Sequence, residues 1–292
     1  MKWASASSDY ESFDAALDSC VYEISERLET DSPDLLVVFV SPHHAEHFET
    51  IPRALKDRMN AVNIIGCSAG GVIGNGKEIE QRHGLSLTGA VLPGVDVTPF
   101  KIDDKDLPDL DSPPQLWEKL TGADPSSDPS FLILTDPFTI RSENLIMGLD
   151  YAFEGGVKIG GMASGGRSQG SNVLMLNDDV FRSGGVGLAL HGNIIVDTIV
   201  AQGCRPIGIP MRVTKSDRNL LLGLNDRPAL DVLKELYDSQ SERDQELVRH
   251  SLFLGVVMDE FKDEPQLGDF LIRNIVGMDP KAGALGIGEI LR

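Results

Sequence analysis

The sequence predicts an α/β protein in which duplicated strand-helix-strand-hairpin units form a mixed sheet, followed by a second, smaller α+β module. Two observations predict this class. Continuous apolar runs such as Leu35–Val40 alternate with segments of helical periodicity, which is typical of buried strands joined by helices. A stretch that contains such a run also recurs 95 positions later, so that Pro42 falls on Pro137 and Gly66 on Gly161.

The elements of the first copy follow from the spacing of its apolar residues. Side chains that recur every three or four positions predict a helix over Phe13–Leu28. The β-branched run Leu35–Val40 predicts a strand that is covered on both faces. Ser41 and Pro42 are then expected to begin a second helix that extends to about Met59, because proline is tolerated in a first helical turn. Two further strands are expected at Trp3–Ser7 and Val62–Ile65.

The second copy is expected to repeat this order. Phe131–Thr135 matches the first apolar run, a helix is expected from about Glu143 to Phe153, and a short helix is expected near Trp117. The residues from Gly74 to Ile79 are predicted to form a loop. Each copy is expected to end in a hairpin. The predicted hairpin strands are His83–Leu92 with Val95–Lys101 around Pro93-Gly94, and Val186–Leu190 with Ile194–Ala201 around His191-Gly192-Asn193.

The pattern changes after the second copy, which predicts domains at 1–202 and 203–292 with a boundary near Gly203–Pro210. No closing helix follows the last expected strand, so the second module is expected to be incomplete. Its expected elements are paired strands at Ile209–Thr214 and Leu220–Leu224, a helix over Pro228–Tyr237, and strands at Leu252–Met258 and Phe270–Val276.

The charge balance argues against nucleic acid and membranes as partners. The chain carries 45 acidic and 26 basic residues, a net charge of −19, and such a surface repels phosphate backbones and anionic lipid heads. No apolar stretch is long enough to span a bilayer, and the N-terminus has no secretory signal. The three cysteines are odd in number and far apart. They favour a reducing compartment, so a cytoplasmic protein is expected.

The two glycine loops are the candidate ligand site. Each follows an apolar strand, and the carboxyl ends of parallel strands share one edge of a sheet, where small ligands collect. Glycine lets backbone N–H groups approach a ligand closely, which suits a small polar metabolite with a carboxylate or an amide. The alternative is that the glycines serve only tight turns and packing between the halves. The predicted binding residues are Ser41, Gly66, Cys67, Ser68, Gly70, Asp136, Gly160, Gly161, Ser164 and Gly165.

An enzymatic alternative comes from the first glycine loop. Gly66–Gly70 matches the Gly-x-Ser-x-Gly elbow of serine hydrolases, with Ser68 as the nucleophile. That elbow leads directly into a helix, whereas the glycine-rich residues after Gly70 do not predict one. No catalytic residue is therefore predicted. No cofactor is expected either, because dinucleotide and nucleotide motifs also require a helix directly after the loop.

The histidines offer a weaker signal. His43 and His47 are four positions apart on an expected helix, which is the spacing of a metal-binding pair. His44 stands where a zinc-protease motif has glutamate, and His83 is isolated in the sequence. We interpret these residues as a solvated first helical turn, and no metal site is predicted.

Six segments occur in a characteristic order along the chain: Leu35–Pro42, Asn63–Gly70, Ile159–Gly166, Gly203–Gly208 with Thr214, Arg227–Leu230 and Gly268–Arg273. This order resembles the FIST family, sensory modules named for F-box and intracellular signal transduction proteins. The resemblance covers nearly the whole chain. It implies a ligand-sensing role, with small molecules such as amino acids proposed as ligands, and no enzymatic activity is established for the family. It also implies output through a separate signalling or ubiquitin-ligase-type protein partner.

Overall fold

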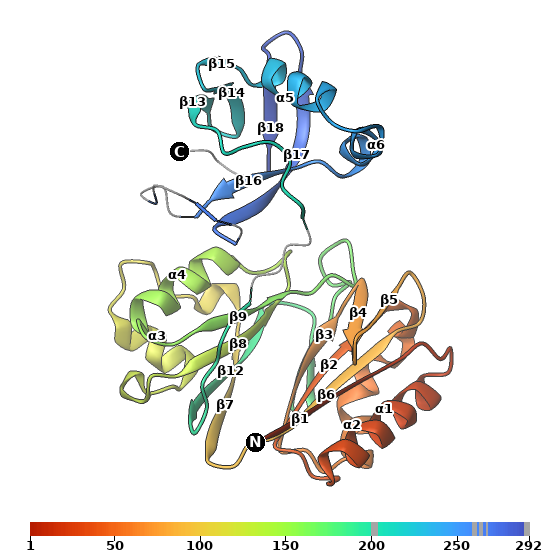
Figure 1. Ribbon diagram of the computed structural model, residues 1–292. Helices are drawn as coiled ribbons and strands as arrows, with labels where there is room; N and C mark the ends of the chain where they lie inside the picture. Colours follow the sequence, from red (N-terminus) through yellow and green to blue (C-terminus); the bar gives the residue numbers. More distant parts are fainter. Residues whose placement is uncertain (200–203, 259–261, 263–264, 267, 289–292) are drawn as a thin grey trace. The chain divides into compact units, whose positions relative to one another are not determined.

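The computed structural model describes residues 1–199, 204–258, 262, 265–266 and 268–288, and the chain divides into two compact units, Met1–Thr198 and Ile199–Arg292. In the first unit two sheets face each other, and helices cover the outer face of each sheet, so that the unit has four layers (Figure 1). The predicted fold class, α/β with a mixed sheet, is confirmed.

The first unit contains two copies of one pattern: strand, helix, strand, helix, strand, hairpin, strand. The first copy comprises β1 (Lys2–Ser8), α1 (Phe13–Leu28), β2 (Leu35–Val40), the 3-10 helix η1 (Pro42–Thr50), α2 (Ile51–Arg58), β3 (Asn63–Ser68), β4 (Gly71–Gly74), β5 (Lys77–Glu80) and β6 (Leu85–Val91). The second copy comprises β7 (Val95–Ile102), η2 (Asp104–Asp106), α3 (Pro114–Thr121), η3 (Pro125–Ser127), β8 (Ser130–Thr135), α4 (Ser142–Ala152), β9 (Lys158–Met162), β10 (Leu174–Leu176), β11 (Asp179–Phe181) and β12 (Gly185–Gly192).

Both copies also share one strand order. The first sheet runs β1-β6-β2-β3 and the second runs β7-β12-β8-β9. In each sheet the second and third strands of the copy, β2 with β3 and β8 with β9, are parallel, and the other pairs are antiparallel. The hairpin β10–β11 of the second copy pairs antiparallel with β3 and extends the first sheet to six strands. The two copies are therefore joined by a shared sheet as well as by the chain.

The two predicted terminal hairpins are wrong. β6 and β7 follow each other across Pro93-Gly94 but lie in different sheets, where β6 pairs with β1 and β2 and β7 pairs with β12. Residues 194–199 form no strand, and Val200 and Ala201 of the second predicted hairpin lie outside the described residues. Two strands joined by a turn give the same local pattern whether they pair with each other or separate into facing sheets.

The predicted loop from Gly74 to Ile79 is also corrected, because β4 and β5 form a hairpin there. Gly74 lies opposite Lys77, so Asn75 and Gly76 make a two-residue turn. Both turn residues have positive φ, 49° and 73°, as a type I′ turn requires. Asn-Gly is the strongest short-range hairpin signal in a sequence, so this element was open to prediction.

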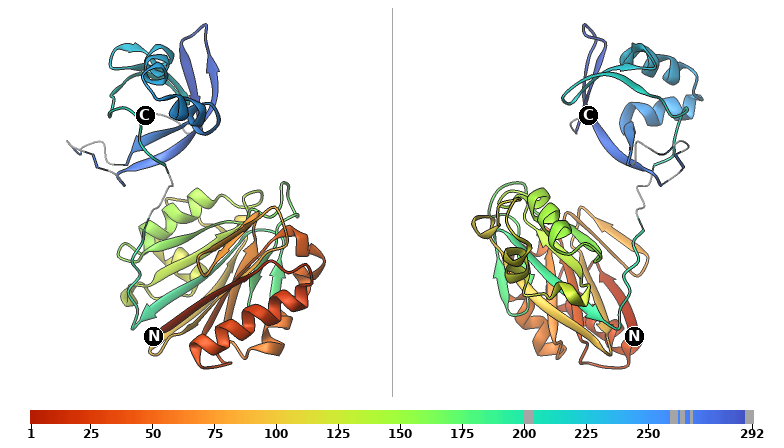
Figure 2. Two further views of the ribbon diagram at one scale, coloured as in Figure 1. Left: turned by 45° about the vertical axis from the view of Figure 1, so that its right-hand side comes forward. Right: turned by 90° about the vertical axis from the view of Figure 1, so that its left-hand side faces the viewer.

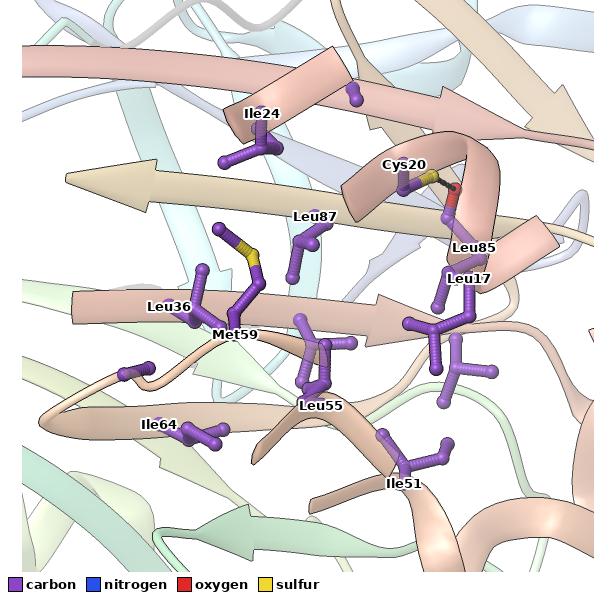
Figure 3. Close-up of a cluster of buried hydrophobic side chains, with 14 of the residues drawn as sticks. Leu17, Cys20, Ile24, Leu36, Ile51, Leu55, Met59, Ile64, Leu85 and Leu87 are labelled. Atoms are coloured by element: carbon purple, nitrogen blue, oxygen red, sulfur yellow. Dashed lines mark hydrogen bonds between the residues drawn. The ribbon is translucent and has the colours of Figure 1, made fainter. Parts of the chain in front are cut away.

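The helices of the first copy pack on the outer face of their sheet (Figures 2 and 3). The buried cluster there includes Leu17, Cys20 and Ile24 of α1, Ile51 and Leu55 of α2, and Leu36, Ile64, Leu85 and Leu87 of the strands. Each large aliphatic side chain in such a cluster contributes about 1.5–3 kcal/mol. Burial raises the pKa of Cys20 to about 12, so this thiol is neutral and belongs to the core.

Two further cores complete the first unit. The cluster between the sheets draws on both copies and includes Leu35, Ile65, Cys67, Leu134, Val186 and Leu188. The other cluster lies under α3 and α4. There Trp117 of α3 is fully buried, and its ring lies directly against Gly148 of α4. Close contact between these helices therefore depends on a residue without a side chain.

The second unit is built on one antiparallel sheet with the order β13-β14-β18-β17-β16. Its small core contains Leu221, Ala229, Leu285 and Ile287. Its elements are β13 (Val213–Asp217), β14 (Leu220–Leu224), β15 (Arg227–Pro228), α5 (Ala229–Asp238), α6 (Glu242–Ser251), β16 (Phe253–Val257), β17 (Phe270–Asp279) and β18 (Ala284–Ile287).

Three details of the second unit differ from the sequence prediction. The first strand begins at Val213 rather than at Ile209, and neither α6 nor β18 was predicted. No residue of α6 is buried, so the helix lacks the apolar stripe by which a helix is recognised. Gly203, where the predicted boundary begins, lies outside the described residues.

Gly148→Ala is expected to destabilise the first unit by about 1–3 kcal/mol, because the new methyl group would overlap the buried ring of Trp117. Alanine is otherwise favoured over glycine in a helix by about 1 kcal/mol, so the steric term has to dominate. Urea unfolding followed by tryptophan fluorescence measures the effect. Gly161→Ala is the control, since a Cβ there meets no atom within 4 Å. A Gly148→Ala variant as stable as the parent would contradict this packing.

Candidate functional site

Ser41 and Asp136 occupy equivalent positions, each directly after the second strand of its copy. The backbone N–H of Ser41 donates to the carbonyl oxygen of Gly84 at 2.8 Å, and that of Asp136 donates to Gly184 at 2.8 Å. Both Ser41 and Asp136 are 1% exposed. In each copy this bond fixes the end of the second strand to the start of the last one. The carboxyl edges of the two parallel pairs are therefore built in the same way.

The two glycine loops contact each other directly at this edge. The backbone N–H groups of Ser164 and Gly165 donate to the carbonyl oxygen of Ser68 at 3.2 and 3.3 Å. Ser164 Oγ accepts a hydrogen bond from the N–H of Gly70 at 3.1 Å. A Cβ on Gly165 would lie 2.6 Å from the Cβ of Ser68. The loops thus converge, and the space between Ser68 and Gly165 is too small to admit a ligand atom.

A buried polar network centred on Asn172 joins the first loop to the strand end of the second copy. Asn172 Oδ1 accepts hydrogen bonds from Ser68 Oγ at 3.1 Å and from the N–H of Gly166 at 2.6 Å. Asn172 Nδ2 donates to Asp136 Oδ1 at 2.9 Å. The three polar side chains are at most 1% exposed. Asn172 was not among the predicted site residues, because nothing in its local sequence marks it.

The carboxylate of Asp136 has a second partner. Thr139 Oγ1 donates to Asp136 Oδ2 at 2.6 Å and accepts a hydrogen bond from the N–H of Gly184 at 2.9 Å. Both carboxylate oxygens are therefore engaged, as a buried charge requires. This arrangement makes Asp136 a structural group of the second copy.

Ser68 lacks the surroundings of a hydrolase nucleophile. It is fully buried, and its single hydroxyl proton is donated to Asn172 Oδ1, an amide oxygen that cannot act as a general base. Its oxygen also accepts a hydrogen bond from the N–H of Val173 at 3.1 Å. The loop leads into β4 rather than into the helix that a nucleophile elbow requires.

Cys67 points into the core between the sheets. It is 3% exposed, and burial raises its pKa to about 12. The thiol is therefore neutral at ordinary pH, and it is a poor nucleophile and a poor metal ligand. Cys20 and Cys204 are also free thiols, and Cys204 is the exposed member of the three.

At Gly66 and Gly160 the third strand of each copy leaves no room for a side chain against the second strand. A Cβ on Gly66 would overlap the carbonyl oxygen of Val38, and a Cβ on Gly160 would overlap that of Ile133. Val38 and Ile133 also lie directly opposite the two glycines on the neighbouring strands. The structure therefore equates Gly66 with Gly160, one residue before the Gly161 of the sequence alignment. The shift arises because β9 pairs with β8 in a register one residue different from that of β3 on β2.

A pocket of about 260 Å³ opens at the same edge of the second copy, where α4 begins after β8. Its first lining residue, Pro137, follows Asp136 in the chain, and Met162 at the end of β9 forms one wall. The lining residues are Pro137, Ile140, Arg141, Ser142, Glu143, Asn144 and Met162. Sequence reasoning placed the helix start correctly to within one residue, but it gave no reason to expect a cavity in front of it.

The start of α4 brings hydrogen-bond donors into the lining of this pocket. The N-cap of α4 is Arg141, whose side chain makes no capping hydrogen bond. The N–H of Ser142 donates to Ile140 at 3.0 Å, so the amides of Glu143 and Asn144 are the ones left to a ligand or to water. Asp104 fixes Arg141 by accepting from its backbone N–H at 2.9 Å and from Nε at 3.0 Å. These hydrogen bonds raise the pKa of Arg141 and lower the pKa of Asp104. Glu143 supplies the one carboxylate of the lining.

A second pocket, of about 320 Å³, belongs to the other unit. Its lining residues are Gly208, Ile209, Met211, Asn225, Arg227, Val232, Glu235, Leu236 and Ser239. Arg227 and Glu235 hydrogen-bond to each other there, which raises the pKa of Arg227 and lowers the pKa of Glu235. The two charges satisfy each other, so neither is left free for a ligand. None of the helices among the described residues has the length and apolarity to cross a membrane.

Comparison with known proteins places these features in a family. A family model described as the FIST N domain matches residues 34–227. The protein Rv0628c of Mycobacterium tuberculosis, which carries the description "uncharacterized", is 34% identical over 273 residues, covering 91% of this chain and 67% of the relative. Mb0898c of Mycobacterium bovis, described in the same way, is 32% identical over 274 residues with the same coverage.

Asn172→Ala is expected to destabilise the first unit by about 2–3 kcal/mol, because it leaves Oδ1 of the buried Asp136 carboxylate and the hydroxyl proton of Ser68 without a partner, although Thr139 and the N–H of Val173 still bind these groups. Urea unfolding measures this loss. Asn193→Ala, at an exposed position with one hydrogen bond to Pro93, is the matched control and should cost less than about 1 kcal/mol. The double variant with Asp136→Ala should lose less than the two single losses together. Full additivity would contradict a shared network.

A serine-reactive fluorophosphonate is expected to leave the folded chain unlabelled, because Ser68 is buried and its proton is held by an amide. Intact-mass spectrometry after incubation reads this out directly. A label that disappears in Ser68→Ala would restore the hydrolase alternative.

Proposed function

The chain belongs to the FIST family of signal-transduction sensory domains, and on that premise we propose that it binds a small, amino-acid-like polar metabolite and signals through a partner protein. The observation that carries the proposal is the pocket at the start of α4, at the carboxyl edge of the parallel pair β8 and β9. In open α/β sheets, ligands bind outside the carboxyl ends of the strands.

The donors of the pocket suit a carboxylate. An uncapped helix N-terminus carries a partial positive charge of about half an elementary charge and presents N–H groups to an anion. The guanidinium of Arg141, which is paired with Asp104, adds N–H donors, and Asn144 adds a neutral amide. The hydroxyl of Ser142 is bonded to Thr135 Oγ1 at 2.9 Å. Asp104 holds Arg141 in place without entering the lining, and its carboxylate offsets part of the charge of the guanidinium.

The acceptor of the pocket suits an ammonium group. Glu143 lies beside Arg141 in the lining, so opposite charges face one small space. An amino acid carries both a carboxylate and an ammonium group and can satisfy both sides at once. Pro137, Ile140 and Met162 supply apolar surface for a side chain. The volume of about 260 Å³ lies just below the usual range for drug-sized ligands, which favours a ligand of this size.

This proposal gives the predicted binding residues two different roles. Asp136, Ser164 and Gly165, with Ser68 and Gly70, shape the meeting of the loops behind the pocket. Gly160 and Gly161 lie on β9, whose last residue, Met162, is a pocket wall. Ser41, Gly66 and Cys67 belong to the first copy, where they support the equivalent edge. In the proposal, the backbone donors of α4, with Arg141, replace the loop glycines as the groups that hold the ligand.

A route for the signal starts next to the pocket. The segment that lines it begins directly after Asp136, whose carboxylate binds Asn172. Asn172 precedes β10, and β10 pairs with β3 of the first copy. A ligand that moves the start of α4 therefore acts on the join between the copies. We place the readout in a signalling or ubiquitin-ligase-type partner in the cytoplasm.

A panel of free amino acids is expected to contain at least one compound that raises the melting temperature by several degrees. A ligand at a hundredfold excess over its dissociation constant adds about 2.7 kcal/mol to the free energy of unfolding. Differential scanning fluorimetry measures the shift. Arg141→Gln should reduce it, because the carboxylate loses its charged partner.

The matched control is Arg53→Gln, which removes a positive charge that is 88% exposed and lies on α2. Its ligand-induced shift should equal that of the parent. The proposal fails if no compound of the panel shifts the melting temperature, or if Arg141→Gln and Arg53→Gln respond alike.

A further inference from the structure

β9 forms the open edge of the second sheet. It is the last strand in the order β7-β12-β8-β9, so in the described part of the chain no strand pairs with its other side. Four of its five residues are exposed, among them Ile159 at 37% and Met162 at 61%. An edge strand of this kind presents a row of unpaired backbone groups to which another chain can bind.

The backbone groups of β9 alternate between the two sides of the strand. The carbonyl oxygen of Val157, just before β9, and the N–H of Ala163, just after it, are bonded to β8 at 2.7 and 2.8 Å. Because this direction alternates from residue to residue, the N–H and C=O groups of Lys158, Gly160 and Met162 point away from the sheet. Three residues of β9 are therefore oriented to pair with an added strand.

The first copy shows what such an edge takes up. β10 runs antiparallel to β3 and pairs with it along Ile65–Cys67. At one end the N–H of Ser68 donates to the carbonyl oxygen of Val173 at 3.0 Å, and at the other the N–H of Asn177 donates to that of Ile64 at 2.8 Å. A short apolar strand thus occupies the whole edge of β3.

The same backbone positions are present on β9. Gly160 is equivalent to Gly66, because each lies where the third strand leaves no room for a side chain against the second. The residues two positions before and after Gly66, Ile64 and Ser68, are then equivalent to the first and last residues of β9. These are the residues whose backbone points outward in both copies. Within the described ranges, β9 lacks only the strand that its counterpart has.

The side chains of β9 leave the edge accessible. A lysine often guards an edge strand, but the amino group of Lys158 is bonded to the carbonyl oxygen of Phe153 and the carboxylate of Asp150, and its side chain is 6% exposed. A Cβ at Gly161 would meet no atom within 4 Å, and Gly160 beside it also lacks a side chain. Two consecutive glycines therefore leave room for large side chains on an added strand.

Charge decides which kind of chain suits this edge. Asp128 lies against Gly155 just before β9, and Glu154 precedes that glycine. Both acidic residues are exposed, and they lie at the amino end of the strand. The chain as a whole carries a net charge of −19, so a second copy is repelled and a basic partner is attracted.

We propose that β9 binds an extended segment of a basic partner protein, which adds to the sheet as an antiparallel strand. Apolar side chains of the segment lie opposite Gly160 and Gly161, and the lysines or arginines that follow them lie beside Asp128 and Glu154. In strand addition, main-chain hydrogen bonds give affinity and alternate side chains give specificity. The existence of a partner rests on the proposed function, whereas the surface is independent of the ligand in the pocket at α4.

A peptide copied from β10 tests this surface. It carries Asn172–Leu176 followed by two lysines, with a fluorescent label at its N-terminus, and fluorescence anisotropy measures its binding to the full chain. Replacement of the two lysines by glutamates should weaken the affinity at least about tenfold. N-methylation at Met175, the residue expected opposite Gly160, should weaken it as much, because it removes a main-chain hydrogen bond.

Variants of β9 locate the bound peptide. Ile159→Lys should lower the affinity at least about tenfold, because it places a charge on the edge. Ile73→Lys is the matched control, since it makes the same change at a side chain on β4 that is 69% exposed, and its affinity should equal that of the parent. Met162→Pro removes an outward N–H and should act like Ile159→Lys. Circular dichroism verifies folding, and Ile159→Lys decides alone if Met162→Pro does not fold.

The proposal is overturned if the peptide does not bind, if N-methylation leaves its affinity unchanged, or if Ile159→Lys binds it as tightly as the parent. Light scattering should show a monomer. A dimer that Ile159→Lys dissociates would instead assign the edge to a second copy. No amino acid is present in these titrations, so their failure would leave the ligand of the proposed function standing, and an amino-acid panel without effect would leave this surface standing.

Discussion

The hydrogen bonds of Asn172 hold the place where the two copies meet, and the rest of the first unit is arranged around them. One amide side chain satisfies the hydroxyl of Ser68 at the end of β3 and the carboxylate of Asp136 just after β8. Both groups are buried, so neither can turn to water for a partner. The carboxyl edges of the two parallel pairs are therefore fixed relative to each other. The core between the sheets, which draws side chains from both copies, packs in that fixed arrangement.

The two copies use one scaffold for different chemistry. The bond from Ser41 to Gly84 and the bond from Asp136 to Gly184 are the same backbone contact. In the first copy histidines surround this contact, whereas in the second copy Thr139 caps a buried carboxylate and α4 begins beside an open pocket. Function resides in side chains placed on a scaffold rather than in the scaffold itself. The two copies therefore present different side chains at equivalent edges of one scaffold.

The exchange of a hairpin makes the two copies interdependent. β10 and β11 belong to the second copy in the sequence but extend the sheet of the first. β3 is buried throughout as a result, whereas its counterpart β9 is largely exposed along its length. A change at the pocket can reach β3 through Asp136, Asn172 and β10, provided that this network has two arrangements that the ligand distinguishes.

The sequence by itself determined the features that depend on near neighbours. The bounds of α1 and β2 were predicted as they are found, because apolar periodicity and a continuous β-branched run are local signals. The repeat likewise located both glycine loops. Only the tertiary structure decided which strands pair, that Gly160 rather than Gly161 corresponds to Gly66, that Asn172 joins a buried network, and that His83 lies against His44. Those outcomes rest on contacts between residues far apart in the chain, and a hydrogen bond or ring contact across that distance leaves no periodic trace in the sequence around either partner.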